Sequence, residues 1–124
     1  MAATALLLGL MLAQASPATL TVEANRADGN VGYAELANGD ANGAIARIEA
    51  GGGAQRNDPA ALINLGSANA RLGRLASARQ HYVAAIKSDD PQDLELADGR
   101  WMDSRRAARL ALRMLDGGTV LALR

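Results

Sequence analysis

The sequence predicts a mainly helical fold, built from two antiparallel helix hairpins followed by a C-terminal capping helix. Two observations favour it. Apolar side chains recur at helical spacing over 62–72, 75–86 and 107–114. In addition, Gly32 and Gly39 lie seven residues apart, and Gly66 and Gly73 repeat this pair at an offset of 34. A fixed period of this length is typical of stacked helical repeats.

The second copy of the repeat carries the clearer helix signals. Asp58 and Pro59 predict a helix start, because Asp can cap free N–H groups and Pro suits the first turn. This helix is broken at Gly73, and a second helix is expected to end near Ser88. The turn between them is so short that the two helices must pack antiparallel.

The first copy is weaker but follows the same pattern. Its helices are expected over about 28–38 and from 40 or 41 to 50. A loop over 51–57, which includes three consecutive glycines, then connects the two copies. Small residues are needed where the paired helices approach each other closely, and Gly66 and Ala78 meet that need in the second copy.

Residues 25–92 resemble the tetratricopeptide repeat family. The motif that carries the resemblance is Leu62-x2-Leu65-Gly66, then Gly73, Ala78-x3-Tyr82 and Ala85. Leu62 stands where Trp is usual in the family, and Asn69 stands where Tyr is usual. The resemblance implies a non-catalytic scaffold whose first helices line a groove for a peptide or helix of another protein.

By the same resemblance, six residues of the first helices are candidates to line that groove: Tyr33, Leu36, Ile63, Asn64, Ser67 and Arg71. Asn64 and Arg71 could hydrogen-bond an extended peptide. The lysine-rich carboxylate clamp of some family members is not evident, because Lys87 is the only lysine. Since about three repeats are usually needed to close a core, either residues 93–124 complete it or the protein associates with itself or a partner.

The C-terminal region, 93–124, does not continue the repeat. Two interpretations compete for 91–103: a short third helix ending at Gly99, or a β-hairpin of 94–97 and 100–103. The hairpin is favoured, because Asp98-Gly99 suits a type I′ turn. Leu96 would then lie across from Trp101.

A last helix is expected over about 104–115, ended by Gly117 and Gly118. It would cap the apolar face that stacked repeats leave open. Residues 19–22 and 119–123 alternate like strands. Either segment could add to the hairpin edge, and both could equally be disordered termini.

Residues 1–15 are rich in apolar side chains and carry no charge. The run is too short to span a bilayer but matches the apolar core of a secretory signal, with cleavage expected after Ala15. A basic n-region is missing, so a buried N-terminal helix is the alternative, and the true start could lie upstream. The signal predicts a periplasmic or secreted protein whose mature segment 16–24 precedes the repeats.

Composition excludes several classes of function. The chain has no cysteine, so it has no disulfide, zinc–thiolate site or thiol nucleophile. Its net charge of zero and 2% aromatic content argue against nucleic-acid binding. His81 is the only histidine, no nucleophile motif is present, and the carboxylates of 89–103 do not match a calcium loop. We therefore expect no enzyme, cofactor or metal site.

Two further features bear on partners. Arg105, Arg109 and Arg113 share one face of the last helix. They form either a solvated face that could pair with the acidic segment 89–103, or a basic patch for an anionic partner such as a membrane surface, which is not favoured. Trp101 is expected to fill the core, with a binding hot spot as the alternative. The leading expectation is a protein-binding adaptor, and the alternative is a structural or envelope-associated subunit that uses self-association or the arginine face.

Overall fold

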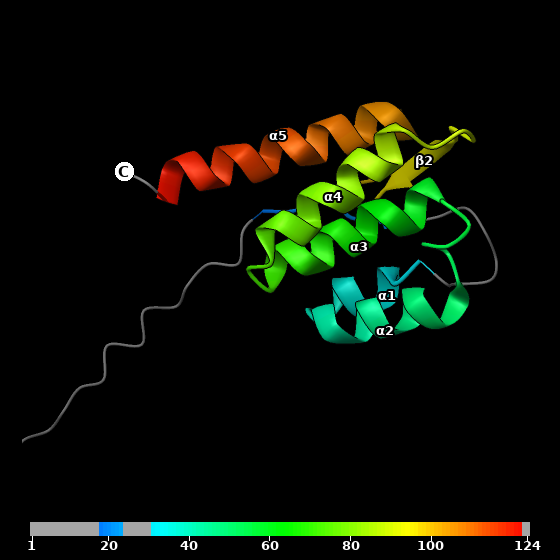
Figure 1. The fold of residues 1–124 in the computed structure, drawn as a ribbon, viewed down its shortest axis with the longest axis horizontal. Coiled ribbons are helices and arrows are strands. Elements are labelled where there is room, and N and C mark those ends of the chain that lie inside the picture. Colours follow the sequence, from blue (N-terminus) through cyan, green and yellow to red (C-terminus); the bar gives the residue numbers. More distant parts are fainter. Residues whose placement is uncertain (1–17, 24–30, 123–124) are drawn as a thin grey trace, which may run out of the picture.

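A computed structural model of the chain describes residues 18–23 and 31–122, with side chains up to residue 118. It is mainly helical with a small antiparallel sheet, as predicted (Figure 1). In chain order the elements are β1 (Val22–Glu23), α1 (Tyr33–Ala37), α2 (Ala41–Gly51), α3 (Pro59–Arg71), α4 (Leu75–Ile86), β2 (Asp93–Leu96), β3 (Trp101–Asp103) and α5 (Ser104–Ala122). Within the described part of the chain, no helix is long and apolar enough to cross a membrane.

Helix α3 lies at the centre of the fold (Figure 1). It packs against α1, α2, α4, α5 and β1, and every residue from Pro59 to Ala70 is buried. Its start is as predicted: Asp58 accepts a hydrogen bond from the Ala60 N–H at 3.1 Å, and Pro59 opens the first turn. Small side chains along α3 allow neighbours to approach on all sides.

The predicted close approach of α3 and α4 occurs at Gly66. A Cβ atom at this position would lie 2.6 Å from Cε1 of Tyr82 and 3.2 Å from the carbonyl oxygen of Ala78. The Tyr82 ring therefore occupies the space that a side chain at residue 66 would need. This contact explains why glycine stands in the middle of a helix, where it costs about 1 kcal/mol relative to alanine.

The first hairpin differs from its prediction at the N-terminal end. Helix α1 begins at Tyr33, because Gly32 has φ +70° and cannot continue a right-handed helix upstream. Residues 28–30 of the predicted helix lie outside the described residues. Helix α2 begins as predicted, after Asp40, whose carboxylate accepts the Gly43 N–H at 2.8 Å.

The β-hairpin is confirmed and the short third helix is not. The register is shifted by one from the prediction, because Trp101 lies opposite Glu95 and not Leu96. The turn is also not type I′: Gly99 alone has positive φ, at +84°, and its N–H donates to the Leu96 carbonyl at 2.8 Å. The Asp98 carboxylate accepts the Arg100 N–H at 3.0 Å, which stabilises a three-residue loop instead.

Of the two segments that alternate like strands, one joins the sheet. Val22 pairs with Leu96, so β1 lies along the edge of β2, which is one of the two alternatives that the sequence left open for the N-terminal segment. The other prediction is wrong, because α5 continues through Gly117 and Gly118 to Ala122. A glycine ends a helix where it adopts positive φ, and neither of these two does.

Candidate binding surfaces

The six predicted groove residues lie on α1 and α3, where three of them pack in the core and the other three bond to the chain's own N-terminal segment. Leu36 and Ile63 are core side chains, 2% and 0% exposed, and they belong to separate clusters. Tyr33 is half-buried against the cluster that contains Ile63. The three polar candidates all bond to the main chain or side chains of residues 19–22, described next. The groove is therefore filled by residues 18–23, which we call the N-terminal strand segment.

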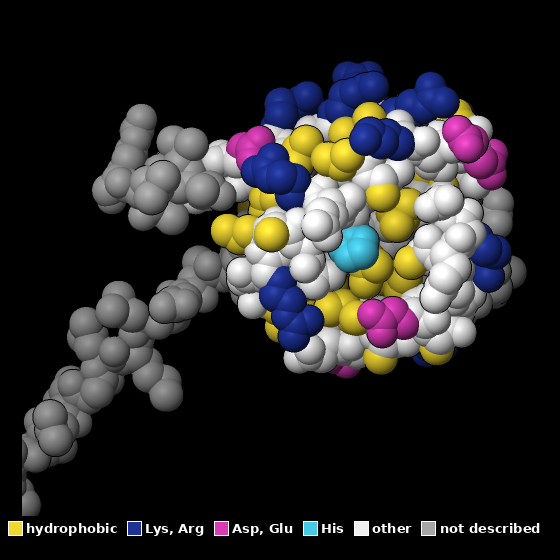
Figure 2. All heavy atoms as spheres, in the orientation of Figure 1, with side chains coloured by type: hydrophobic (Ala, Val, Ile, Leu, Met, Phe, Trp, Pro, Cys, Tyr) yellow, Lys and Arg dark blue, Asp and Glu magenta, His cyan; other side chains and the backbone are white. Residues whose placement is uncertain are grey.

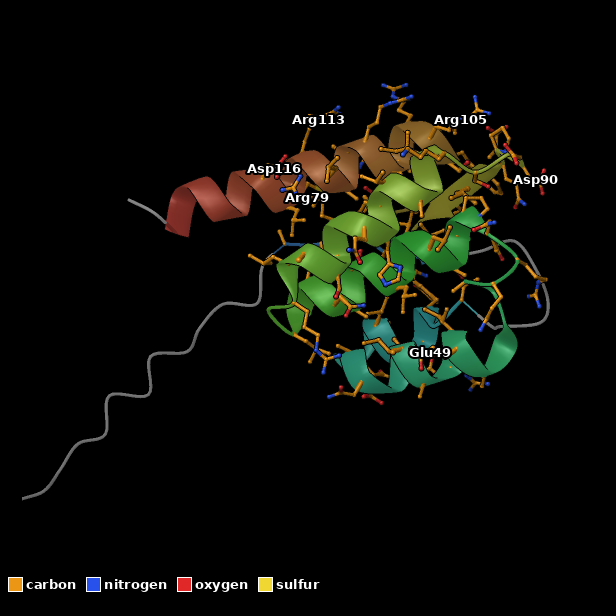
Figure 3. The ribbon with its side chains drawn as sticks, in the orientation of Figure 1. Glu49, Arg79, Asp90, Arg105, Arg113 and Asp116 are labelled. Atoms are coloured by element: carbon orange, nitrogen blue, oxygen red, sulfur yellow. The ribbon has the colours of Figure 1, made fainter. Side chains whose placement is uncertain are left out.

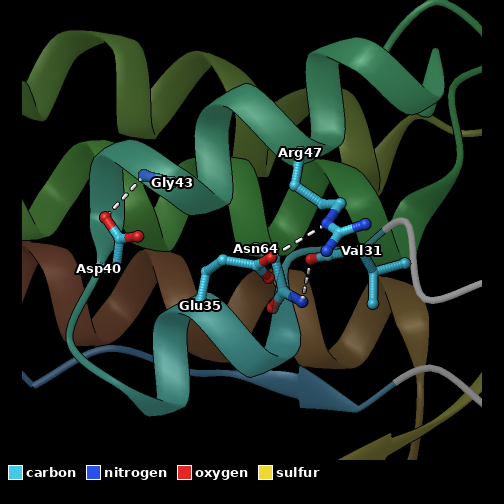
Figure 4. A network of polar contacts seen from close by, with 6 residues as sticks. All are labelled: Val31, Glu35, Asp40, Gly43, Arg47 and Asn64. Atoms are coloured by element: carbon cyan, nitrogen blue, oxygen red, sulfur yellow. Dashed lines mark hydrogen bonds and ion pairs between the residues drawn. The ribbon is translucent and has the colours of Figure 1, made fainter.

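Asn64 is the central contact to this segment. Its side-chain oxygen accepts the Val22 N–H at 2.8 Å, and its Nδ2 donates to the Val22 and Val31 carbonyl oxygens, each at 2.8 Å. The contact to Val31 is drawn in Figure 4. Asn64 is 0% exposed, so all of these bonds are shielded from water. One amide thus bonds both main-chain groups of an extended residue.

Ser67 makes the next contact along α3. Its hydroxyl donates to the Leu20 carbonyl oxygen and lies 2.9 Å from the Tyr82 hydroxyl. Burial raises the pKa of Tyr82, an effect that the Ser67 hydrogen bond and the nearby Arg71 charge oppose. The pair satisfies two buried hydroxyls and links the N-terminal strand segment to α4.

Arg71 closes the groove at its outer end. Its guanidinium donates to the Leu36 carbonyl at 2.6 Å and to the hydroxyls of Thr19 and Thr21 at 2.9 and 3.1 Å. A shallow depression of about 390 Å³ lies beside it, between Ala18, the turn over 39–42 and Leu72. Arg71 therefore ties α1, α3 and the N-terminal strand segment together.

The sequence interpretation named the polar residues of α3 but not the N-terminal strand segment to which they bond. Thr19, Leu20, Thr21 and Val22 alternate in polarity, but only Thr19 is half-exposed, because Leu20, Thr21 and Val22 are 7%, 9% and 0% exposed. A role of these residues toward a partner peptide stays a prediction.

The outer face of the sheet is a second candidate surface. Leu94 and Leu96 point inward, at 3% and 1% exposure, so the residues that alternate with them point outward. Trp101, opposite Glu95, shares this outer face and is 54% exposed. The prediction that Trp101 fills the core is therefore wrong. Its neighbours on the outer face are the carboxylates of Glu23, Asp93, Glu95 and Asp103, by the pairing register.

The arginine face of α5 is exposed as predicted. Arg105, Arg106, Arg109 and Arg113 are exposed, and basic side chains gather along this edge of the molecule (Figure 2). Arg105 and Arg113, the two of these four that are labelled in Figure 3, point outward there. Among the described residues, no carboxylate pairs with these four; α5 pairs instead through Asp116 with Arg79 of α4. The alternative in which these arginines pair with segment 89–103 is not seen among the described residues. Asp103 instead caps α5 by accepting the Arg105 and Arg106 N–H groups.

His81 is half-buried on α4. Burial lowers its pKa, and the negative charge of Glu49 on α2 partly opposes this. Figure 3 shows Glu49 on the α2 side that faces α4. Among residues 18–23 and 31–118, no three carboxylate or histidine side chains are grouped as metal ligands would be.

Comparisons with protein-family models, with curated proteins and with solved structures find no match to this chain. The likeness to the tetratricopeptide repeat therefore depends on the motif residues and on the paired helices alone. Function has to be argued from the surfaces described above.

Proposed function

We propose that this protein is a non-catalytic protein-binding module that docks its partner on the outer face of the sheet. The groove that the repeat resemblance implies is occupied by the N-terminal strand segment. A partner would therefore need another surface. The observation that supports the proposal is Trp101, a large aromatic side chain left 54% exposed on an edge strand.

Tryptophan is enriched among the few interface residues that contribute most of the binding energy. Burying the exposed half of the Trp101 ring would contribute about 3 kcal/mol, at about 25 cal/mol per Å² of apolar surface. The edge strand β3 also offers its outer main-chain groups to a partner strand.

The surroundings of Trp101 favour a partner with basic side chains. Glu95 lies directly opposite Trp101, and Asp93 lies opposite Asp103 two residues along the strand. Arginine or lysine of a partner could pair with these carboxylates and stack on the indole ring. Partners with acidic side chains at these positions would be repelled by the carboxylates, which provides specificity.

The experiment is affinity capture of the partner from envelope and secreted fractions, using the wild-type protein, Trp101→Ala and Leu75→Ala. Leu75 is the matched control, because it is the other large apolar side chain exposed among the described residues, at 41%, and lies on α4. We expect Trp101→Ala to weaken capture about 100-fold, the equivalent of the contact energy above. Equal recovery by both variants would refute the proposal.

A second candidate is a structural subunit held at an anionic surface, which the four arginines on α5 favour. Each arginine near an anionic lipid surface contributes about 1 kcal/mol. The triple variant Arg105→Gln, Arg109→Gln, Arg113→Gln should then float about 100-fold less with phosphatidylglycerol vesicles and unchanged with neutral ones. Equal flotation of variant and wild type would exclude this candidate.

A further inference from the structure

The N-terminal strand segment is bound much as a separate peptide would be. Its receptor consists of α3 and β2, with α1 joined to it through Arg71, and all three elements come from residues 31–103. The segment joins that receptor only through residues 24–30. Ligand and receptor are therefore consecutive, non-overlapping parts of one chain.

The receptor recognises main-chain groups more than side chains. Asn64 bonds the Val22 N–H and carbonyl oxygen, Ser67 bonds the Leu20 carbonyl, and the Ala97 N–H of the hairpin donates to the Thr21 carbonyl at 2.9 Å. The apolar contribution comes from Leu20 and Val22, both buried in the main core. Arg71 adds bonds to the hydroxyls of Thr19 and Thr21. A second copy of the protein carries the same segment and can therefore make all of these contacts.

We propose that the α1–α3 groove accepts the N-terminal strand segment of a second copy, so that two chains exchange β1 reciprocally. This goes beyond the proposed function, because the exchanged contacts are made by α3 and β2 and none of them is made by Trp101. The exchanged form makes the same contacts as the monomer, so its stability relative to the monomer depends on concentration and on residues 24–30. In dilute solution the attached segment has the advantage of a high effective concentration.

The sheet register provides a direct test. Glu23 lies opposite Glu95 across β1 and β2, and antiparallel partners have Cα–Cα distances that a disulfide can span. The chain has no cysteine of its own. Glu23→Cys and Glu95→Cys, made in separate chains, can form this disulfide only when β1 of one copy lies beside β2 of the other.

The two single variants, one of them carrying a mass tag, are unfolded together in denaturant, refolded together and oxidised. We expect a 23–95 linked heterodimer, identified by mass, whose fraction rises about tenfold between about 10 and about 100 µM protein by mass action. The double variant Glu23→Cys/Glu95→Cys is the positive control, because in dilute solution it should link within one chain. Glu23→Cys with Asp98→Cys is the collision control, since Asp98 lies exposed at the hairpin turn and does not pair with β1.

A heterodimer yield no higher than that of the collision control, with the double variant still linking internally, would overturn the exchange. A yield several-fold above that control, with the concentration dependence, would support it. Trp101→Ala added to either chain should leave the yield unchanged, so this result is independent of the surface proposed above.

Discussion

The two helix hairpins share a period of 34 residues, yet their first helices differ in length. Helix α3 has 13 residues and α1 has five. Gly39 and Gly73 have the same φ, +76°, and occupy corresponding turns of the two hairpins. Gly32 and Gly66 also correspond, but Gly32 has φ +70° before a helix whereas Gly66 lies inside one.

The difference teaches that a repeated glycine can keep its packing role while its backbone role changes. A Cβ at Gly32 would lie 3.1 Å from the Ala44 Cβ, and one at Gly66 would lie 3.2 Å from the Ala78 carbonyl. Both glycines let the second helix of their hairpin approach. Only the second copy has an Asp-Pro start, so only there does the first helix extend to full length.

The largest expected effect comes from removing the Asn64 side chain, by which α3 of the second hairpin binds the N-terminal strand segment. Asn64→Ala removes three hydrogen bonds and leaves buried main-chain groups unpaired, so we expect a loss of about 3–4 kcal/mol in the free energy of unfolding. Asn69→Ala is the matched control. That buried side chain bonds only the Leu65 carbonyl of its own helix, and the loss should stay below about 1 kcal/mol. Equal losses in urea unfolding would contradict the role given to Asn64.

Gly66→Ala should be next, at about 2–3 kcal/mol, because the new methyl group overlaps the Tyr82 ring. Gly73→Ala meets no atom within 4 Å and should cost only about 1 kcal/mol for its positive φ. In a Tyr82→Leu background the Gly66→Ala loss should shrink below about 1 kcal/mol. Additive losses in this double-mutant cycle would show that the ring contact is not the cause.

The next comparison is between the helical glycines near the end of α5 and the glycine of the β-hairpin turn. Gly117→Ala with Gly118→Ala should stabilise the protein by about 1–2 kcal/mol, because both positions are helical with open space around them. Gly99→Ala, at φ +84°, should instead destabilise it by about 1 kcal/mol. Thermal unfolding by circular dichroism measures both. A loss of stability in the double alanine variant would place the helix end before Gly117, as the sequence alone suggests.

The smallest effect concerns the pKa of His81 on α4, which burial lowers and the charge of Glu49 on α2 raises. Burial lowers its folded-state pKa below the unfolded value, so the unfolded chain binds more protons as the pH falls below about 6.5. The stability contribution is present above the unfolded pKa and is lost as the pH falls. His81→Gln should flatten the dependence of unfolding free energy on pH between about 7.5 and about 5.5, where histidine is the side chain that titrates. The same slope in both proteins would contradict this assignment.

Local signals predicted most of the helix and hairpin positions. Asp40 and Asp58 marked helix starts that the structure confirms, and Asp98-Gly99 marked the hairpin. The errors have different physical origins. Whether Trp101 is buried depends on tertiary packing, which neither propensity nor spacing reports. A glycine such as Gly117 can adopt either helical or positive-φ backbone, so its presence alone does not end a helix.

The candidate site was predictable in its chemistry and not in its occupant. The positions of Asn64, Ser67 and Arg71 on one helix face follow from helical spacing. That residues 18–23 fill this face depends on a contact across more than forty positions of sequence, for example the separation of 42 between Val22 and Asn64. A strand of two residues is too short for its pairing partner to be predicted from the sequence alone.

The amide of Asn64 bonds both Val22 and Val31, so it fixes the two ends of the stretch between them at one point. One side chain of α3 therefore holds together β1 and the residue two positions before α1, which are nine positions apart in the sequence.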